Sequence, residues 1–195
     1  MKARLIDLSL PLRKPELDTV GQRDAELFRQ GHYGTHLDRH TVDAVPLEYF
    51  KSRALLFDLG AFSAQRPVEK ADVPLDMVRQ NDSVLFHTGA MLRNPYASKE
   101  YLAEHIEFSW DLITALLEKD IRFMGVDARG LRMNEEHRKA DMLCEDSGTF
   151  VIENLTNTEL LPVNTPFMLY AAWFDSGSSG LPCRVIAEIS PSCDD

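Results

Sequence analysis

The stretch 32–40 reads His-Tyr-Gly-Thr-His-Leu-Asp-Arg-His and places three possible metal ligands within seven residues. His32 and His36 offer imidazole nitrogens, and Asp38 offers a carboxylate oxygen. This combination of nitrogen and oxygen ligands suits zinc or manganese. The sequence therefore predicts a metal site centred on this stretch, and a purely structural role is the alternative.

The spacing limits the backbone that could present these side chains together. On a strand, His36 and Asp38 share a face about 6.6 Å apart, but His32 would lie about 13 Å from His36. A helical turn would bring His32 and His36 together, yet Gly34 and Thr35 are poor residues for a helix interior. We expect an irregular turn or short helix that presents the two histidines, with Asp38 completing the set.

The composition fits a globular chain with one hydrophobic core. The chain has 195 residues, is 44% hydrophobic and carries a formal net charge of −10. A charge of this sign argues against nucleic acid as a partner, because binding phosphates needs clustered Lys and Arg. We expect a single domain spanning 1–195 that acts on a small molecule.

The cysteines and the N-terminus indicate a cytoplasmic protein. Cys144, Cys183 and Cys193 form no C-x-x-C pair, which fits a reducing compartment. Residues 1–7 lack the apolar segment of a secretory signal, and no apolar run approaches the length of a membrane span. Neither a membrane partner nor a disulfide scaffold is expected.

Apolar runs of strand length alternate with segments of helical spacing along the chain. We predict strands at 4–8, 53–60, 82–89, 121–127, 149–155, 167–174 and 184–189. Helices are expected at 73–78, 98–119 and 135–144, with Ser109 as an N-cap, whereas 17–31 is expected to be a surface loop or lid. Strands outnumber helices, so the expected fold is a mixed, β-rich α/β domain.

Other polar residues could complete the site. Glu153 lies in an apolar strand, where a buried carboxylate needs a cation or hydrogen bonds. Asp141 is expected to be a solvated carboxylate on a helix, and His105 and His137 are expected to face solvent. His87 ends a strand beside a possible pocket rim, although a core or edge position is favoured.

Nucleophilic Ser or Cys catalysis has no sequence support. The Ser-rich turn 176–180 lacks a G-x-S-x-G pattern, and no cysteine has a recognisable His partner. G-x-G-x-x-G and P-loop motifs are absent as well.

The same motifs resemble those of a known family. The stretches that carry the likeness are Ile6-Asp7-Leu8-Ser9, 32–38, 85–89 (Leu-Phe-His-Thr-Gly), 124–128 (Met-Gly-Val-Asp-Ala), 151–157 (Val-Ile-Glu-Asn-Leu-Thr-Asn) and 180–187. With its H-x-G-T-H-x-D and E-N-L-x-N motifs, the chain resembles the cyclase family of metal-dependent hydrolases, which includes bacterial kynurenine formamidase and isatin hydrolase. The resemblance implies a compact β/β/α, swivelling-domain-like fold. It also implies a homo-oligomer (dimer or tetramer) and one or two divalent ions.

The resemblance also implies site residues by position. His32, His36, Asp38 and Glu153 match the metal-ligand pattern of the family. A further His ligand is expected about twelve residues before the Glu, where this chain has Asp141; a carboxylate is also a sound ligand for zinc or manganese. His137 is the other candidate for that position if the helix is shifted.

The acid/base position departs from the family pattern. The family motif continues D-x-P-x-H, and its last His is the acid/base; this chain has His40 in place of Pro and Val42 in place of that His. The following loop looks shorter than usual, so a gap near Arg39 could place His40 in the acid/base role.

These observations predict a metal-dependent amidohydrolase acting on an arylformamide, such as N-formylkynurenine, or a cyclic amide. A metal-activated water would attack the carbonyl, and His40 would pass a proton to the leaving nitrogen. A non-catalytic metal- or small-molecule-binding protein is the main alternative, and a lactonase or dehydratase is a third. Substrate choice is expected to come from the loops 17–31 and 90–100.

Overall fold

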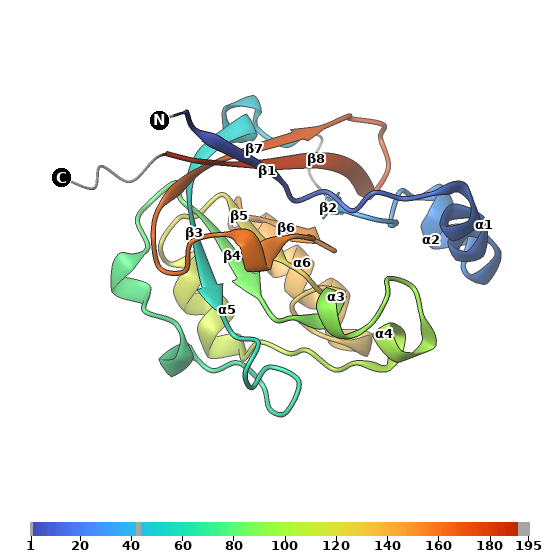
Figure 1. Cartoon of the computed structure of the whole chain (residues 1–195), viewed down its shortest axis with the longest axis horizontal. Coiled ribbons are helices and arrows are strands. Elements are labelled where there is room, and N and C mark those ends of the chain that lie inside the picture. The colour runs from blue at the N-terminus through green and yellow to red at the C-terminus, as the bar shows by residue number, and fades with distance from the viewer. Residues whose placement is uncertain (1, 42–43, 191–195) are drawn as a thin grey trace.

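The computed structural model describes residues 2–41 and 44–190, whose strands form one eight-stranded sheet (Figure 1). The strands are β1 (Arg4–Asp7), β2 (His36–Asp38), β3 (Lys51–Asp58), β4 (Ser83–His87), β5 (Phe123–Val126), β6 (Phe150–Glu153), β7 (Phe167–Trp173) and β8 (Gly180–Ile189). Their order is β1-β8-β2-β6-β5-β4-β3-β7, and β7 also pairs with β8. All strands except β1 therefore close into a barrel, and β1 extends it along β8.

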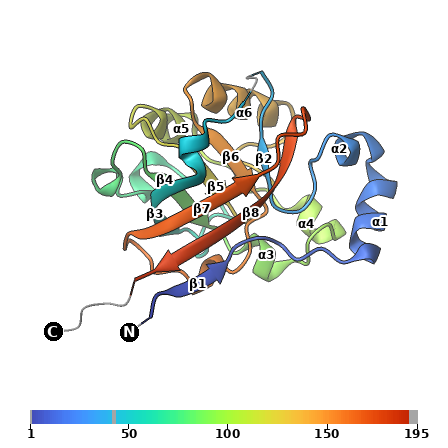
Figure 2. The same ribbon diagram turned by 90° about the horizontal axis from the view of Figure 1, so that it is seen from above.

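Helices surround this barrel unevenly. They are α1 (Lys14–Arg23), α2 (Ala25–Arg29), α3 (Ala90–Arg93), α4 (Lys99–Ala103), α5 (Trp110–Leu117) and α6 (His137–Asp146), with 3-10 turns at Leu47–Phe50, Lys70–Asp72, Leu75–Met77, Asn134–Glu136 and Thr158–Leu160. Figures 1 and 2 show α5 and α6 on one side of β3–β6, and β1, β7 and β8 on the other side. The helices α1 and α2 project beyond the end of β8.

The four strands β3 to β6 run parallel and are buried on both faces. Leu55 and Val84 point to a core shared with α5 and α6, whereas Leu56 and Leu85 point to the barrel interior. Successive side chains on a strand face opposite ways, so a strand covered on both faces must be apolar throughout. This explains why these strands appear in the sequence as continuous apolar runs.

The segment predicted as one helix from Ser98 to Lys119 contains two helices. Ser98 caps α4 and Ser109 caps α5, each accepting a hydrogen bond from a backbone N–H three residues later. Between them, Phe108 forms a bridge with Val68 and is buried. The predicted N-cap at Ser109 is therefore confirmed, while an extended segment that buries Ile106 and Phe108 interrupts the helix.

The expectation of a loop at 17–31 is wrong, because α1 and α2 occupy most of it. Val20 is the one buried residue of these two helices, so no apolar period marks them in the sequence. Local signals are present: Pro15 lies in the first turn of α1, and the Asp24 side chain accepts a hydrogen bond from the Leu27 N–H. The predicted helix at 73–78 is reduced to the 3-10 turn Leu75–Met77.

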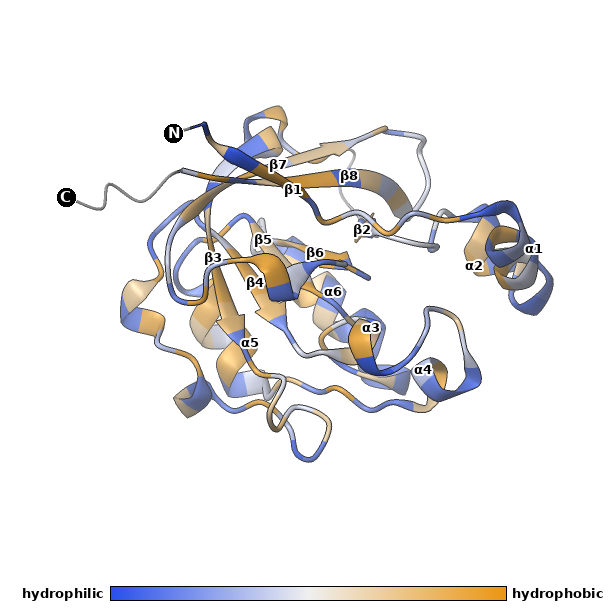
Figure 3. Ribbon diagram, in the orientation of Figure 1, coloured by the Kyte–Doolittle hydropathy of each residue, from blue (hydrophilic) through white to orange (hydrophobic). Residues whose placement is uncertain are grey.

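The observed architecture confirms the predicted β-rich, mixed α/β fold. Coloured by hydropathy, the central strands and α5 are largely orange, whereas α1 is mostly blue (Figure 3). Within the described part of the chain, none of the helices has the length and apolar character needed to span a membrane.

Candidate metal centre

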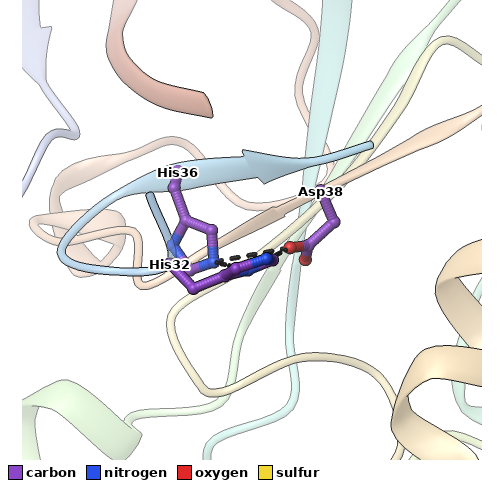
Figure 4. A group of neighbouring side chains, drawn as sticks. All are labelled: His32, His36 and Asp38. Carbon is purple, nitrogen blue, oxygen red and sulfur yellow. Dashed lines mark hydrogen bonds and ion pairs between the residues drawn. The ribbon is translucent and has the colours of Figure 1, made fainter. Parts of the chain in front are cut away.

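A tight turn followed by β2 brings three polar side chains together (Figure 4). Gly34 adopts a positive φ of 58°, so the chain turns sharply at this residue. The strand β2 begins two residues later, at His36. His36 and Asp38 then lie on the same face of β2, and His32 reaches them from the loop. The predicted irregular turn is thus observed. It brings His32 next to His36, which a continuous strand would hold about 13 Å away.

The distances within this first group are those expected around a small ion. His32 Nδ1 lies 3.3 Å from His36 Nε2 and 2.9 Å from Asp38 Oδ1, and His36 Nε2 lies 3.5 Å from Asp38 Oδ1. Ligand atoms bound to zinc with bonds near 2.1 Å are separated by about 3–3.5 Å. The three side chains could therefore hold one divalent ion with little movement.

A second group of possible ligands shares Asp38 with the first. It adds His137, Asp141 and Glu153, and one ligand atom from each of the four residues lies within 4.8 Å of the others. Glu153 is brought in by the antiparallel pairing of β2 and β6, in which it lies opposite His36. His137 and Asp141 lie four residues apart on α6 and so face the same way. His137 Nε2 is 3.4 Å from both Asp141 Oδ2 and Glu153 Oε1.

Each of these histidines is held by one ring nitrogen and presents the other to the carboxylates. His36 Nδ1 donates to the Gly34 carbonyl at 2.9 Å, and His137 Nδ1 donates to the Arg132 carbonyl at 3.1 Å. His32 Nε2 is hydrogen-bonded to the Ser179 hydroxyl at 2.9 Å. Hydrogen bonds of this kind fix the orientation and tautomer of metal-binding histidines.

Several buried carboxylate oxygens at this centre lack a hydrogen-bond partner among the described residues. They are both oxygens of Asp38, both oxygens of Asp141 and Oε1 of Glu153. Histidine nitrogens approach these oxygens at 2.9–3.6 Å. Burying carboxylates without hydrogen bonds costs several kcal/mol each unless a cation compensates them. The donor set and these oxygens both fit one or two divalent ions.

The pKa values of the residues at this centre are shifted because several buried charges lie close together. Burial and the charge of Asp38 raise the pKa of Glu153 to about 7, and the same two effects raise the pKa of Asp141. Burial lowers the pKa of His36 and His137, but the surrounding carboxylates outweigh it and raise both values to about 9. Protons thus occupy the centre near neutral pH, and a divalent cation binding there would displace them.

His40 stands at the edge of this centre. Its ring stacks on that of His32 with 6.2 Å between centroids, and its Nε2 lies 3.6 Å from Asp141 Oδ2. The nearby Asp141 raises the pKa of His40 above its ordinary value, against an opposing effect of burial. Val42, which occupies the usual acid/base position, lies outside the described residues.

The centre opens into a cavity of about 770 Å³. His32, His36, His40, His137 and Glu153 all line it. So do residues of both segments from which substrate choice was expected: Arg23, Asp24, Leu27 and Gln30 from 17–31, and Tyr96 and Ala97 from 90–100. The first segment contributes helices α1 and α2, not the predicted loop.

Asn154, in the E-N-L-x-N motif, connects the two halves of the site. It adopts a positive φ of 56°, and its Nδ2 donates to the Gly34 carbonyl at 3.0 Å. Its backbone carbonyl accepts from Thr35 Oγ1 at 2.8 Å, and its side-chain oxygen accepts from the Tyr101 hydroxyl. Asn154 therefore fixes the turn that carries His36 to the strand that carries Glu153.

Two expectations about α6 are wrong. Asp141 is buried with 3% exposure and is not a solvated carboxylate. His137 does not point to solvent, since it contacts Asp141 and Glu153. The structure therefore brings both candidates for the later ligand to the centre, where the sequence left a choice between them. The signal in the sequence was their spacing of four residues, which places two ligand types on one helical face.

The other two histidines lie away from the centre. His105 is exposed, as expected. His87 is half-buried at the end of β4, where Nδ1 lies 2.8 Å from Thr158 Oγ1 and 3.1 Å from Asp127 Oδ2. It does not line the cavity.

Gly130 provides a direct test of the second ligand group. Its φ is +100°, and a Cβ there would lie 2.5 Å from Glu153 Oε1 and 2.7 Å from His137 Cε1. We expect Gly130→Ala to displace these side chains and weaken metal binding by roughly 10–100-fold, as loss of a supporting contact does. The matched control is Gly177→Ala, because Gly177 also has a positive φ but no atom within 4 Å of the added Cβ. Metal titration of both variants checks this. Equal affinities would mean that Glu153 and His137 do not hold an ion.

Comparison with solved structures identifies the fold. A potential metal-dependent hydrolase with cyclase activity matches with a TM-score of 0.74 and 23% identity, over 97% of this chain and 100% of that one. A predicted metal-dependent hydrolase from Bacillus stearothermophilus matches with 0.71 and 19%, over 96% and 99%. Isatin hydrolase A from Ralstonia solanacearum matches with 0.74 and 18%, over 96% and 92%.

Comparison with curated proteins found no match. The family model described as "Putative cyclase" matches residues 6–131, which include the 32–40 stretch and more than half of the chain. The chain therefore belongs to the Cyclase family.

Proposed function

We propose that the protein is a metal-dependent hydrolase that cleaves the C–N amide bond of a small substrate. One observation carries this proposal: two groups of possible ligands share Asp38, and their buried carboxylate oxygens lack hydrogen-bond partners beside a cavity. The solved structures with this fold support it, since they are described as hydrolases, two of them metal-dependent.

The residues that would hold ions follow from the two groups. His32, His36 and Asp38 would bind one ion, and Asp38, His137, Asp141 and Glu153 would bind a second. Nitrogen and oxygen ligands favour zinc or manganese. When bound, a divalent ion supplies polarisation of the amide carbonyl and activation of water.

His40 is suited to handling the proton of this reaction. Its Nε2 is buried without a hydrogen-bond partner among the described residues and faces the centre near Asp141. A side chain in this position could take a proton from the attacking water and give it to the leaving nitrogen. Asp141 would orient the imidazole and stabilise its charged form.

The described residues provide no better nucleophile than water. Burial raises the pKa of the Cys144 and Cys183 thiols far above the ordinary value, and neither cysteine lines the cavity. Ser179 lines the cavity and its hydroxyl is hydrogen-bonded to His32 Nε2. With His32 Nδ1 bound to the proposed ion, Nε2 would carry the proton of the ring and could not deprotonate this hydroxyl. Hydrolysis without a covalent intermediate on the protein is therefore the favoured reaction.

The cavity wall supports an aryl substrate. Among the residues that line it, Tyr96 and Leu102 are only partly buried and offer aromatic and apolar surface beside the polar centre, with the buried Tyr101 and Met133 behind them. An arylformamide such as N-formylkynurenine, or a cyclic amide, would place its ring on this wall and its carbonyl at the centre.

The test is hydrolysis by protein reconstituted with zinc or manganese. We expect turnover within a panel containing N-formylkynurenine, formanilide, N-formylanthranilate, a cyclic imide and a lactone. Chelation should abolish turnover, and the added metal should restore it. Metal-loaded protein that hydrolyses none of the panel would favour a non-catalytic binding protein instead.

A further inference from the structure

Three arginines line the cavity without an acidic partner among residues 2–41 and 44–190. They are Arg23 on α1, Arg129 after β5 and Arg138 on α6. Arg23 donates to the Ala97 carbonyl, and Arg129 donates to the Leu102 carbonyl.

Several arginines outside the cavity pair with carboxylates. Arg66 pairs with Asp72, Arg93 with Glu104, and Arg39 with Asp175. Ion pairs therefore form readily on this surface. The three cavity arginines have no such pair among the described residues, so their positive charge is left uncompensated at the cavity wall.

Of these three arginines, Arg129 lies in the best position to bind a ligand group. It is half-buried, whereas Arg23 and Arg138 are exposed. The 2.7 Å hydrogen bond from Nη1 to the Leu102 carbonyl holds one end of the guanidinium and leaves its other donors available. The next residue, Gly130, lies against Glu153 and His137, so Arg129 is adjacent to the proposed metal centre.

Arg129 also lies close to the aromatic wall. Burial raises the pKa of the phenols of Tyr96 and Tyr101, and the positive charge of Arg129 partly opposes this rise. A ligand ring resting on the half-buried Tyr96 could therefore carry a negative group toward the guanidinium. Arginine binds carboxylates through paired, charge-assisted hydrogen bonds.

We propose that Arg129 binds a carboxylate of the substrate and so selects anionic aryl amides over neutral ones. This inference rests on the proposed hydrolase function and specifies its substrate class. Arg23 and Arg138 contribute positive potential at the same cavity. The competing role for Arg129 is structural, through its hydrogen bond to Leu102.

Binding without turnover separates these roles. The probes are anthranilate and its neutral isostere anthranilamide, titrated by calorimetry into manganese-loaded protein. The wild type should bind anthranilate roughly 10–100-fold more tightly, the usual worth of a charge-assisted hydrogen bond. Arg129→Gln should remove this preference while leaving anthranilamide affinity unchanged. Lys139→Gln removes an exposed charge on α6 that does not line the cavity, and it should keep the preference.

Other outcomes overturn the assignment. A preference that persists in Arg129→Gln would place the carboxylate on the metal or on another arginine. Equal weakening of both probes in Arg129→Gln would give Arg129 a structural role only. No preference, or no binding of either probe, in the wild type would mean that no carboxylate site exists.

The experiments can reject the proposed hydrolase function and the proposed role of Arg129 independently of each other. Turnover of formanilide without any carboxylate preference would reject the role of Arg129 and keep the hydrolase. A carboxylate preference that depends on Arg129, without turnover of any amide, would keep the anion site and reject hydrolysis.

Discussion

Protein carrying Asp38→Asn is expected to lose its divalent ions. Asp38 is the one residue shared by the two ligand groups, and both of its oxygens are buried. Asparagine keeps the shape but removes the negative charge, so metal affinity should fall well beyond the ~10–100-fold cost of losing an outer partner. Hydrolysis should fall with it. Elemental analysis after gel filtration, together with metal titration, measures the loss.

The free energy of unfolding provides a check on this variant. In the metal-free protein, despite burial, His36 and His32 hold the pKa of the Asp38 carboxyl well below its usual range, so the charged carboxylate stabilises the fold. Chelator-treated Asp38→Asn should therefore unfold at a lower temperature than chelator-treated wild type, in a transition that is still cooperative, which separates loss of metal from loss of the fold. Asp111→Asn is the matched control, because Asp111 is exposed on α5, and it should keep its metal. Wild-type metal content in Asp38→Asn would contradict the shared-ligand arrangement.

Replacing His40 with alanine should separate catalysis from metal binding. His40 does not belong to either ligand group, yet it lines the cavity beside Asp141. We expect the variant to keep its metal and to lose roughly 10²–10⁴-fold in the hydrolysis of an arylformamide, the usual worth of general acid/base catalysis. Steady-state kinetics and metal analysis on the same preparation check this.

His105→Ala is the control for His40, since His105 is exposed and away from the cavity. It should behave like the wild type in both measurements. A parallel loss of metal and activity in His40→Ala would make His40 a ligand. No change in either would remove it from the mechanism and leave the acid/base role unassigned.

The sequence predicted the part of the site whose residues lie close together along the chain. The spacing of His32, His36 and Asp38 predicted both the cluster and the irregular turn, because Gly34 and Thr35 exclude a regular helix. Glu153 was suspected as a carboxylate in an apolar strand. Its place opposite His36 depends on the pairing of β2 with β6, which sequence spacing does not define.

The sequence was less informative where burial decides the outcome. The helix α6 contains many charged residues, so Asp141 and His137 were expected at its surface. Packing of Ala140 and Cys144 against the sheet turns that face of the helix inward and carries the two ligands with it. The helices α1 and α2 were missed for the opposite reason, since they bury almost nothing and show no apolar period.

The most direct test is a titration of metal-free protein with manganese or zinc while the hydrolysis of an arylformamide is followed. The proposed function predicts that activity is absent at the start, rises with each addition and reaches its plateau at one or two ions per chain. Activity that is already present in fully metal-free protein, or a chain that binds no metal even in excess, would contradict it.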